Sequence, residues 1–146
     1  MKTIALRFSD KFAPEEGTIS AHENYIEEKG YVWYGKLGNP ISKKISEEIL
    51  KDRNETPILL IHSGKTKRYW AYVNKIQRDQ PGYEDIPAYY RDDADKFKTW
   101  FRVTKIVEAE KEVMGKCIVS SSKQVLSNVS KHSMSPYFII EYEDKE

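Results

Sequence analysis

The strongest constraint on the fold is a short, continuously apolar stretch in the middle of the chain. Residues 56–63 read TPILLIHS, which is typical of a strand that is covered on both faces. The glycine-containing turn GKT follows at 64–66, and the aromatic stretch KRYWAYVNKI comes next at 67–76. The sequence therefore predicts a central hairpin against which the rest of the chain packs.

Further strands and several helices are expected around this hairpin. Residues 2–8 alternate apolar and polar side chains, and strands are also expected within 97–113 and 136–143. Helices are expected near residues 18–29, 42–52 and 121–131, each with serine or threonine available as a cap. Because strands cluster instead of alternating with helices, the fold class is α+β, with a strongly curved, mainly antiparallel sheet or a small barrel.

A long connection separates the hairpin from the strand that begins near residue 97. Residues 77–96 contain prolines, tyrosines and acidic side chains without any period, which indicates a surface loop. A loop of this length in a compact domain is usually functional or disordered. No repeat, low-complexity segment or linker interrupts the chain, so one domain is expected over residues 1–146.

Composition excludes several classes of function. The chain has one cysteine and three histidines, with no disulfide partner and no zinc spacing, and it lacks a glycine-rich phosphate loop. We therefore expect no metal and no cofactor. No apolar run approaches a membrane span and the N-terminus turns polar too early for a secretory signal, so a cytoplasmic location is expected. With a net charge of only +1, nucleic-acid binding would need a local cluster of lysines and arginines.

The sequence contains no motif that indicates nucleophilic or metal-assisted catalysis. Cys117 lies in MGKCIVSS, which looks like a strand, so a buried and inert thiol is expected. His22 lies on the apolar face of a predicted helix and His62 ends an apolar strand, and a packed histidine is the default interpretation of both. The carboxylates of YRDDADK lack the glycine and distal glutamate of a calcium loop. The chain is not expected to be an enzyme.

Clustered aromatic residues after the first predicted helix point to a ligand. The stretch YVWYG places Tyr31, Trp33 and Tyr34 where a strand meets the turn-like GKLGNP. An aromatic ring at such a rim can form the wall of a pocket. Trp70 and Trp100 lie in or beside predicted strands, where a structural role is expected.

The order of these segments resembles the PUA-like superfamily, and within it the YTH and EVE branch. The similarity covers about residues 30 to 106 and rests on VW followed by a polar helix, PILLIHSGKTKRYWAYVNKI, an aromatic loop and FKTWFRVTKI. In YTH domains a tryptophan in a position like Trp33 forms one wall of a cage around a methylated adenine, and the loop before the later strand supplies the other. That loop has no tryptophan here. The resemblance thus implies a cage of Trp33 with Tyr31, Tyr34, Tyr83, Tyr89 and Tyr90.

By this resemblance the chain is a nucleic-acid reader that recognises a modified base, with methylation favoured, and has no catalysis of its own. Similar prokaryotic domains are specificity modules of modification-dependent restriction and other defence systems, so DNA is favoured over RNA and the implied partner is an effector nuclease or ATPase domain or subunit. The basic residues expected to contact the nucleic-acid backbone are Lys43, Lys44, Lys65, Lys67 and Arg68.

Two alternatives remain open from the residues. One is a PUA-like hydrolase of a modified nucleoside, in which a lysine, a threonine and a glutamate cooperate; Lys36, Thr66 and Glu84 are present without a diagnostic spacing. The other is a module that binds a small molecule or a protein through the acidic loop at 84–95.

Overall fold

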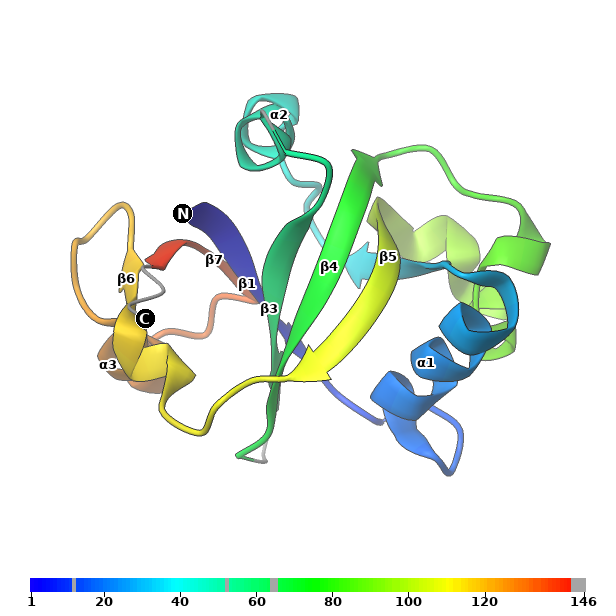
Figure 1. Ribbon diagram of the computed structural model, residues 1–146, viewed down its shortest axis with the longest axis horizontal. Coiled ribbons are helices and arrows are strands. Elements are labelled where there is room, and N and C mark those ends of the chain that lie inside the picture. Colours follow the sequence, from blue (N-terminus) through cyan, green and yellow to red (C-terminus); the bar gives the residue numbers. More distant parts are fainter. Residues whose placement is uncertain (12, 52, 64–65, 143–146) are drawn as a thin grey trace.

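The described residues form one seven-stranded sheet with the strand order β2-β5-β4-β3-β1-β7-β6 (Figure 1). The structure, a computed structural model, describes residues 1–11, 13–51, 53–63 and 66–142. The strands are β1 (Lys2–Phe8), β2 (Val32–Leu37), β3 (Thr56–His62), β4 (Arg68–Gln77), β5 (Phe97–Glu108), β6 (Cys117–Val119) and β7 (Tyr137–Tyr142). β1 and β3 run parallel, and every other described pair of named strands is antiparallel.

The predicted central hairpin is confirmed. β3 and β4 pair in antiparallel register from Thr56 opposite Val73 to Ile61 opposite Arg68. Ile58, Leu59 and Leu60 are all buried, so successive side chains are covered on both faces of the sheet, as a continuous apolar run predicts.

The expected strongly curved sheet or small barrel is only partly right. The sheet is mixed and mostly antiparallel, but it is neither closed nor strongly curled. β2 at one edge pairs with β5 alone among the described strands. Residues 88–96 of the connection between β4 and β5 contact β2, and Tyr90 among them is buried. This connection, and not a further described strand, therefore packs beside β2.

Two of the three predicted helices begin close to their expected positions. α1 (Gly17–Lys29) ends at Gly30, whose φ of 87° is the left-handed conformation that glycine adopts without strain. α2 (Lys43–Leu50) is capped by Ser42, whose hydroxyl accepts a hydrogen bond from the Ile45 amide at 3.2 Å. The predicted end of this helix at residue 52 lies outside the described residues.

The third helix starts later than predicted. α3 (Leu126–His132) begins after residues 120–125, which fold back beside β6. In that segment Val125 forms an isolated bridge to Ile118, and the Val119 amide donates to the carbonyl of Gln124. Backbone pairing outweighs the local helical spacing there.

The long connection at 77–96 is ordered around two 3-10 helices. They are η1 (Tyr83–Asp85) and η2 (Ala88–Lys96), and a third, η3 (Val113–Lys116), precedes β6. Ile86, Tyr90 and Ala94 of this connection are buried against β2 and β5. The expected surface loop is thus partly a wall of the core.

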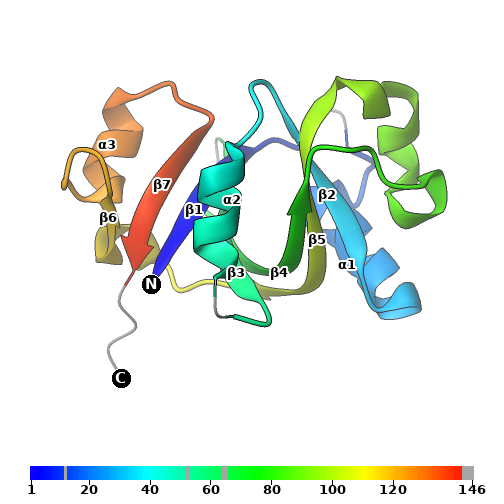
Figure 2. The same cartoon turned by 90° about the horizontal axis from the view of Figure 1, so that it is seen from above.

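The helices lie at different places on the sheet. α1 contacts β2 and β5, α2 contacts β1 and β4, and α3 contacts β6 at the far end (Figure 1). In Figure 2 the loop between α3 and β7, the loop between β2 and α2, and the segment with η1 and η2 follow one another along the same side of the molecule. No helix in the described ranges combines the length and apolar character needed to cross a membrane.

Candidate functional site

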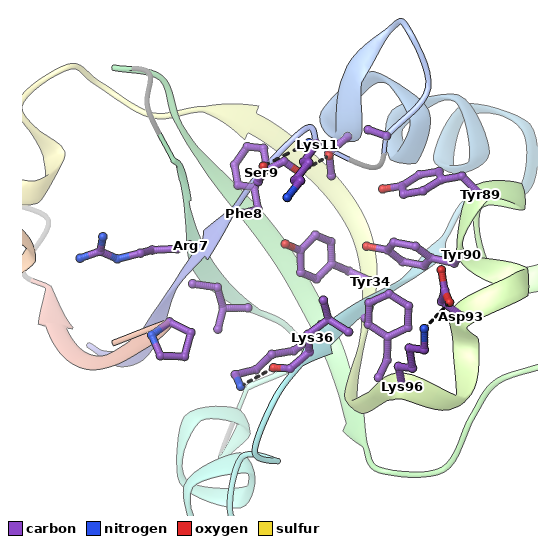
Figure 3. Close-up of a pocket in the computed structure, with 17 residues that line it drawn as sticks. Arg7, Phe8, Ser9, Lys11, Tyr34, Lys36, Tyr89, Tyr90, Asp93 and Lys96 are labelled. Carbon is purple, nitrogen blue, oxygen red and sulfur yellow. Dashed lines mark hydrogen bonds and ion pairs between the residues drawn. The ribbon is translucent and has the colours of Figure 1, made fainter. Parts of the chain in front are cut away.

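A cavity of about 480 Å³ opens on the side where these loops gather. Its walls come from the end of β1 and the residues after it, the start of α1, the strand β2, the helix η2 and Pro136 before β7 (Figure 3). These segments are far apart in the sequence, and the sheet brings them together. The volume is in the range of pockets that hold a whole small ligand.

Three tyrosines form the aromatic wall of this cavity. Tyr34 comes from β2, and Tyr89 and Tyr90 come from η2 (Figure 3). The rings of Tyr89 and Tyr90 have centroids 4.7 Å apart, and Phe97 lies 4.6 Å from Tyr90. Burial raises the pKa of all three phenols, so they are neutral hydroxyls at physiological pH. The wall offers flat apolar surface together with groups that donate and accept hydrogen bonds.

His22 of α1 supports this wall from behind. It is 1% exposed, and its ring centroid lies 5.1 Å from that of Tyr34 and 5.3 Å from that of Tyr90. Its Nδ1 is 2.8 Å from the carbonyl oxygen of Thr18, so Nδ1 carries the proton and donates. Burial lowers the pKa of His22 to about 4. This confirms the interpretation of His22 as a packed histidine.

Trp33 is buried and does not lie at a rim, which corrects the expected place of its ring. The side chain is 6% exposed and packs with Ile86, Ala94 and Trp100. It does not line the cavity. Neighbouring residues of a strand point to opposite faces, so Tyr34 and Lys36 face the cavity while Trp33 lies beneath the residues after η1. Trp100 is fully buried, as expected.

The other predicted cage residues divide into two groups. Tyr34, Tyr89 and Tyr90 come together at the cavity, whereas Tyr31 and Tyr83 do not line it. The Tyr31 hydroxyl donates to Asp85 Oδ1 at 2.8 Å, and the guanidinium of Arg102 lies over its ring at 4.2 Å. Tyr83 is 53% exposed to solvent.

None of the predicted backbone-binding residues that the structure describes lines this cavity. Lys43 borders a second, smaller cavity of about 280 Å³ beside Arg78, and Lys44 is exposed in the first turn of α2. Lys67 lies 3.7 Å from Glu108, and Arg68 donates from Nε to the sulfur of Met114 at 3.0 Å. Lys65 lies outside the described residues.

The cations that do line the cavity are Arg7, Lys11, Lys36 and Lys96. Asp93 is the one carboxylate among the described lining residues, and it lies 2.8 Å from Lys96. The cavity is therefore more positive than the chain as a whole. Only Lys36 had a signal in the sequence, since it follows Tyr34 at the two-residue spacing of a strand face.

The guanidinium of Arg7 turns away from the tyrosines (Figure 3). It donates to the carbonyl oxygens of Ser130 at 2.7 Å and Ser133 at 2.9 Å, at the end of α3. Arg7 therefore connects the segment before Pro136 to β1 by hydrogen bonds.

Asp10 holds the wall that follows β1. Its Oδ1 accepts from the Thr18 amide at 2.9 Å, which caps α1, and its Oδ2 lies 2.5 Å from His62 Nε2. Burial alone would raise the pKa of Asp10, but the hydrogen bonds with His62 and Thr18 lower it to about 2. His62 Nδ1 lies 2.9 Å from the carbonyl oxygen of Ser63, so both ring nitrogens of His62 face oxygen acceptors.

The groups named for a hydrolase are not assembled. Lys36 lines the cavity, whereas Thr66 follows β3 and Glu84 is exposed in η1, and neither lines it. Cys117 is buried, its thiol donates to the carbonyl of Val113 at 3.3 Å, and burial raises its pKa to about 11. Among the described residues no three His, Cys, Asp or Glu side chains converge as a metal ion requires.

One of three comparisons with known proteins identifies a family for this chain. Neither the curated proteins nor the solved structures contain a significant match. A family model described as Pua-like matches residues 4–141, which span all seven strands apart from their outermost residues and the cavity between β1, α1, β2 and η2. By this match over nearly its whole length, the chain belongs to the Pua-like family.

Proposed function

We propose that the protein is a nucleic-acid reader and that its cavity receives a base against Tyr34, Tyr89 and Tyr90. The observation that carries the proposal is an open pocket with three phenol rings on one side and an excess of cations around it. Aromatic rings stack on bases, and each such contact contributes roughly 1–3 kcal/mol. Domains of the Pua-like family often bind nucleic acid, which supports the same assignment.

The base in this proposal carries a modification, with a methyl group favoured. A methyl on an exocyclic nitrogen adds apolar surface, and burying one such carbon contributes on the order of 0.8 kcal/mol. The base must leave its stack to enter the cavity, from a single strand or from a duplex. DNA is favoured over RNA, and an effector nuclease or ATPase is the proposed partner, as in modification-dependent restriction or another defence system.

A binding screen tests the proposal directly. DNA and RNA oligonucleotides with N6-methyladenine, 5-methylcytosine, 5-hydroxymethylcytosine or no modification are titrated by fluorescence anisotropy at several salt concentrations. We expect preference for one modified base and an affinity that falls with salt, because each neutralised phosphate contributes a slope of roughly −0.7 to −0.9 in log K against log salt.

A matched pair of variants ties that binding to the cavity. Tyr89→Ala removes a half-buried ring from the tyrosine wall, and Tyr83→Ala removes an exposed ring of the same connection that does not line the cavity. Tyr89→Ala should weaken binding of the preferred oligonucleotide by about tenfold or more. Tyr83→Ala should bind like the wild type. Equal binding by the two variants, or no binding to any oligonucleotide, would contradict the proposal.

A nucleoside hydrolase is a second candidate, and the location of Lys36 in the cavity is the observation that favours it. It is weaker because the nearby carboxylate Asp93 is already bound by Lys96 and neither Thr66 nor Glu84 lines the cavity. Release of a free base or a changed nucleoside on incubation with the protein distinguishes a hydrolase from a reader.

A further inference from the structure

Lys36 is a buried cation that has no carboxylate partner in the described part of the fold. The residue is 6% exposed, and its Nζ donates to the carbonyl oxygens of Leu37 at 3.0 Å and Asn39 at 2.9 Å. The ammonium lies 4.8 Å from the centre of the Tyr137 ring. Burial lowers the pKa of Lys36. In the described part of the chain no carboxylate forms an ion pair with it, although six other ion pairs occur there.

Among the described residues, this arrangement leaves one N–H group of Lys36 without a hydrogen-bond acceptor and its charge without a carboxylate, with only the Tyr137 ring facing it. An ammonium has three N–H groups, and two of them are taken by the carbonyl oxygens. A buried charge is costly unless it is paired, so the position favours an anionic partner that the protein does not supply. Asp93 lies on the opposite side of the cavity, where it forms an ion pair with Lys96, so it is not the anionic partner of Lys36 (Figure 3).

Lys36 and the tyrosines belong to the same cavity but to different parts of it. Tyr34 and Lys36 are two residues apart on β2 and both line the cavity, and Figure 3 shows the Lys36 ammonium directed away from the rings of Tyr34 and Tyr90. One part of the cavity is therefore flat and aromatic, and the other ends at a cation. A volume of about 480 Å³ leaves room for more than a single base.

We propose that Lys36 binds the phosphate of the same nucleotide whose base lies against the tyrosine wall. The cavity then takes a nucleotide as its unit, with the base and the phosphate in separate parts, and it binds free nucleoside monophosphates as well as polymers. This inference rests on the proposed function for the place of the base.

The test compares ligands that differ only in the phosphate. The four common nucleoside 5′-monophosphates, the four matching nucleosides and inorganic phosphate are titrated into ¹⁵N-labelled protein at constant ionic strength, with amide shifts around Tyr34, Lys36 and Tyr89 reporting the site. At least one monophosphate should bind about tenfold or more tightly than its nucleoside, as is typical of a hydrogen bond to a charged group. Inorganic phosphate should compete with it.

Variants at Lys36 test which side chain is responsible. Lys36→Met keeps an unbranched side chain that is one atom shorter and removes the charge, and it should abolish the preference for the monophosphate. Lys36→Arg should retain part of it. Lys98→Met is the matched control, because Lys98 is exposed on β5, donates to the carbonyl of Asp95 and does not line the cavity. If Lys36→Met fails to fold, the charge is removed from the ligand instead. Dimethyl esters of the monophosphates carry no charge on the phosphate, and they should bind the wild-type protein as weakly as the nucleosides do.

The outcomes separate this inference from the proposed function. The phosphate site is refuted by equal binding of nucleosides and monophosphates, by the absence of measurable monophosphate binding, or by a preference that survives Lys36→Met. Any of these together with oligonucleotide binding at Tyr89 leaves the reader function in place. If monophosphate binding depends on Lys36 but no oligonucleotide binds, the phosphate site is supported and the proposed reader function is refuted.

Discussion

Two neighbouring residues of β2 point to opposite faces of the sheet. The Tyr34 side chain lines the cavity, and the Trp33 side chain packs on the other face among Ile86, Ala94 and Trp100. Both are 6% exposed, so exposure alone does not separate them. What separates them is the empty volume beside Tyr34. In this strand, the face of the sheet to which a side chain points determines its role more than its residue type does.

The burial of Trp33 predicts a large effect on stability. Trp33→Ala should lower the free energy of unfolding by about 3–5 kcal/mol, because truncation of a buried tryptophan leaves a cavity. Urea unfolding followed by circular dichroism measures this. Tyr83→Ala, at an exposed ring, should change the same quantity by no more than about 0.5 kcal/mol. If Trp33→Ala were as stable as the wild type, the burial of Trp33 would be contradicted and a rim position of its ring would be supported.

His22 predicts a loss of stability in mild acid. Its pKa is about 4 in the folded protein and 6.5 as the reference value, so between these pH values the unfolded chain binds a proton that the folded protein does not. The stabilising contribution is complete above pH 6.5 and is lost as the pH falls toward 4. At about 1.4 kcal/mol per pKa unit, the loss is about 3 kcal/mol.

Urea unfolding at pH 7, 5.5 and 4 measures this dependence, with His22→Leu as the comparison. The variant should show a flatter decline over this range. The interval above pH 4 also excludes Asp10, whose pKa is lowered to about 2 and whose contribution is lost only below its reference value of 3.8. Parallel pH profiles for the two proteins would show that another group titrates.

At the scale of elements, the edge strand β2 and the helix η2 make the cavity together. η2 contacts β2, and Phe97, the first residue of β5, packs over Gly35 directly after η2. A Cβ atom built on Gly35 would lie 2.7 Å from the Phe97 ring. The close packing of β2 against the end of η2 and the start of β5 therefore depends on a residue without a side chain.

Gly35→Ala should push Phe97 away from β2 and change the shape of the tyrosine wall. We expect a destabilisation of about 1–3 kcal/mol, as for other overpacked sites, and weaker binding of the preferred oligonucleotide. Gly115→Ala is the control, since nothing lies within 4 Å of a Cβ at that position. Thermal unfolding and anisotropy measure the two effects. An unchanged affinity in a folded Gly35→Ala protein would mean that the position of Phe97 is unimportant for the ligand.

At the scale of the whole molecule, the open sheet accounts for the location of the site. Apolar side chains of β1 and β2 share one core cluster although three strands separate them in the sheet. The same two strands border the cavity. The chain has a net charge of only +1, so the excess of cations around the cavity is local and is not a property of the whole molecule. That residues 1–146 form a single domain stays a prediction.

The sequence by itself determined the features that depend on neighbours along the chain. The continuous apolar run predicts the buried hairpin of β3 and β4, and glycine predicts the end of α1 at Gly30. Such features follow from periodicity and backbone preference, which act over a few residues. The ligand role of the tyrosines in the 77–96 connection stays a prediction.

Only the tertiary structure decided which face of β2 borders the cavity and which residues complete it. Both faces of β2 carry aromatic residues, so the pattern YVWYG is compatible with either face, and the packing of Ile86 and Ala94 on Trp33 selects one. Lys11, Lys96 and Thr18 reach the cavity from three separate segments through long-range packing. Local sequence cannot predict such proximity, because it is created by contacts between residues far apart in the chain.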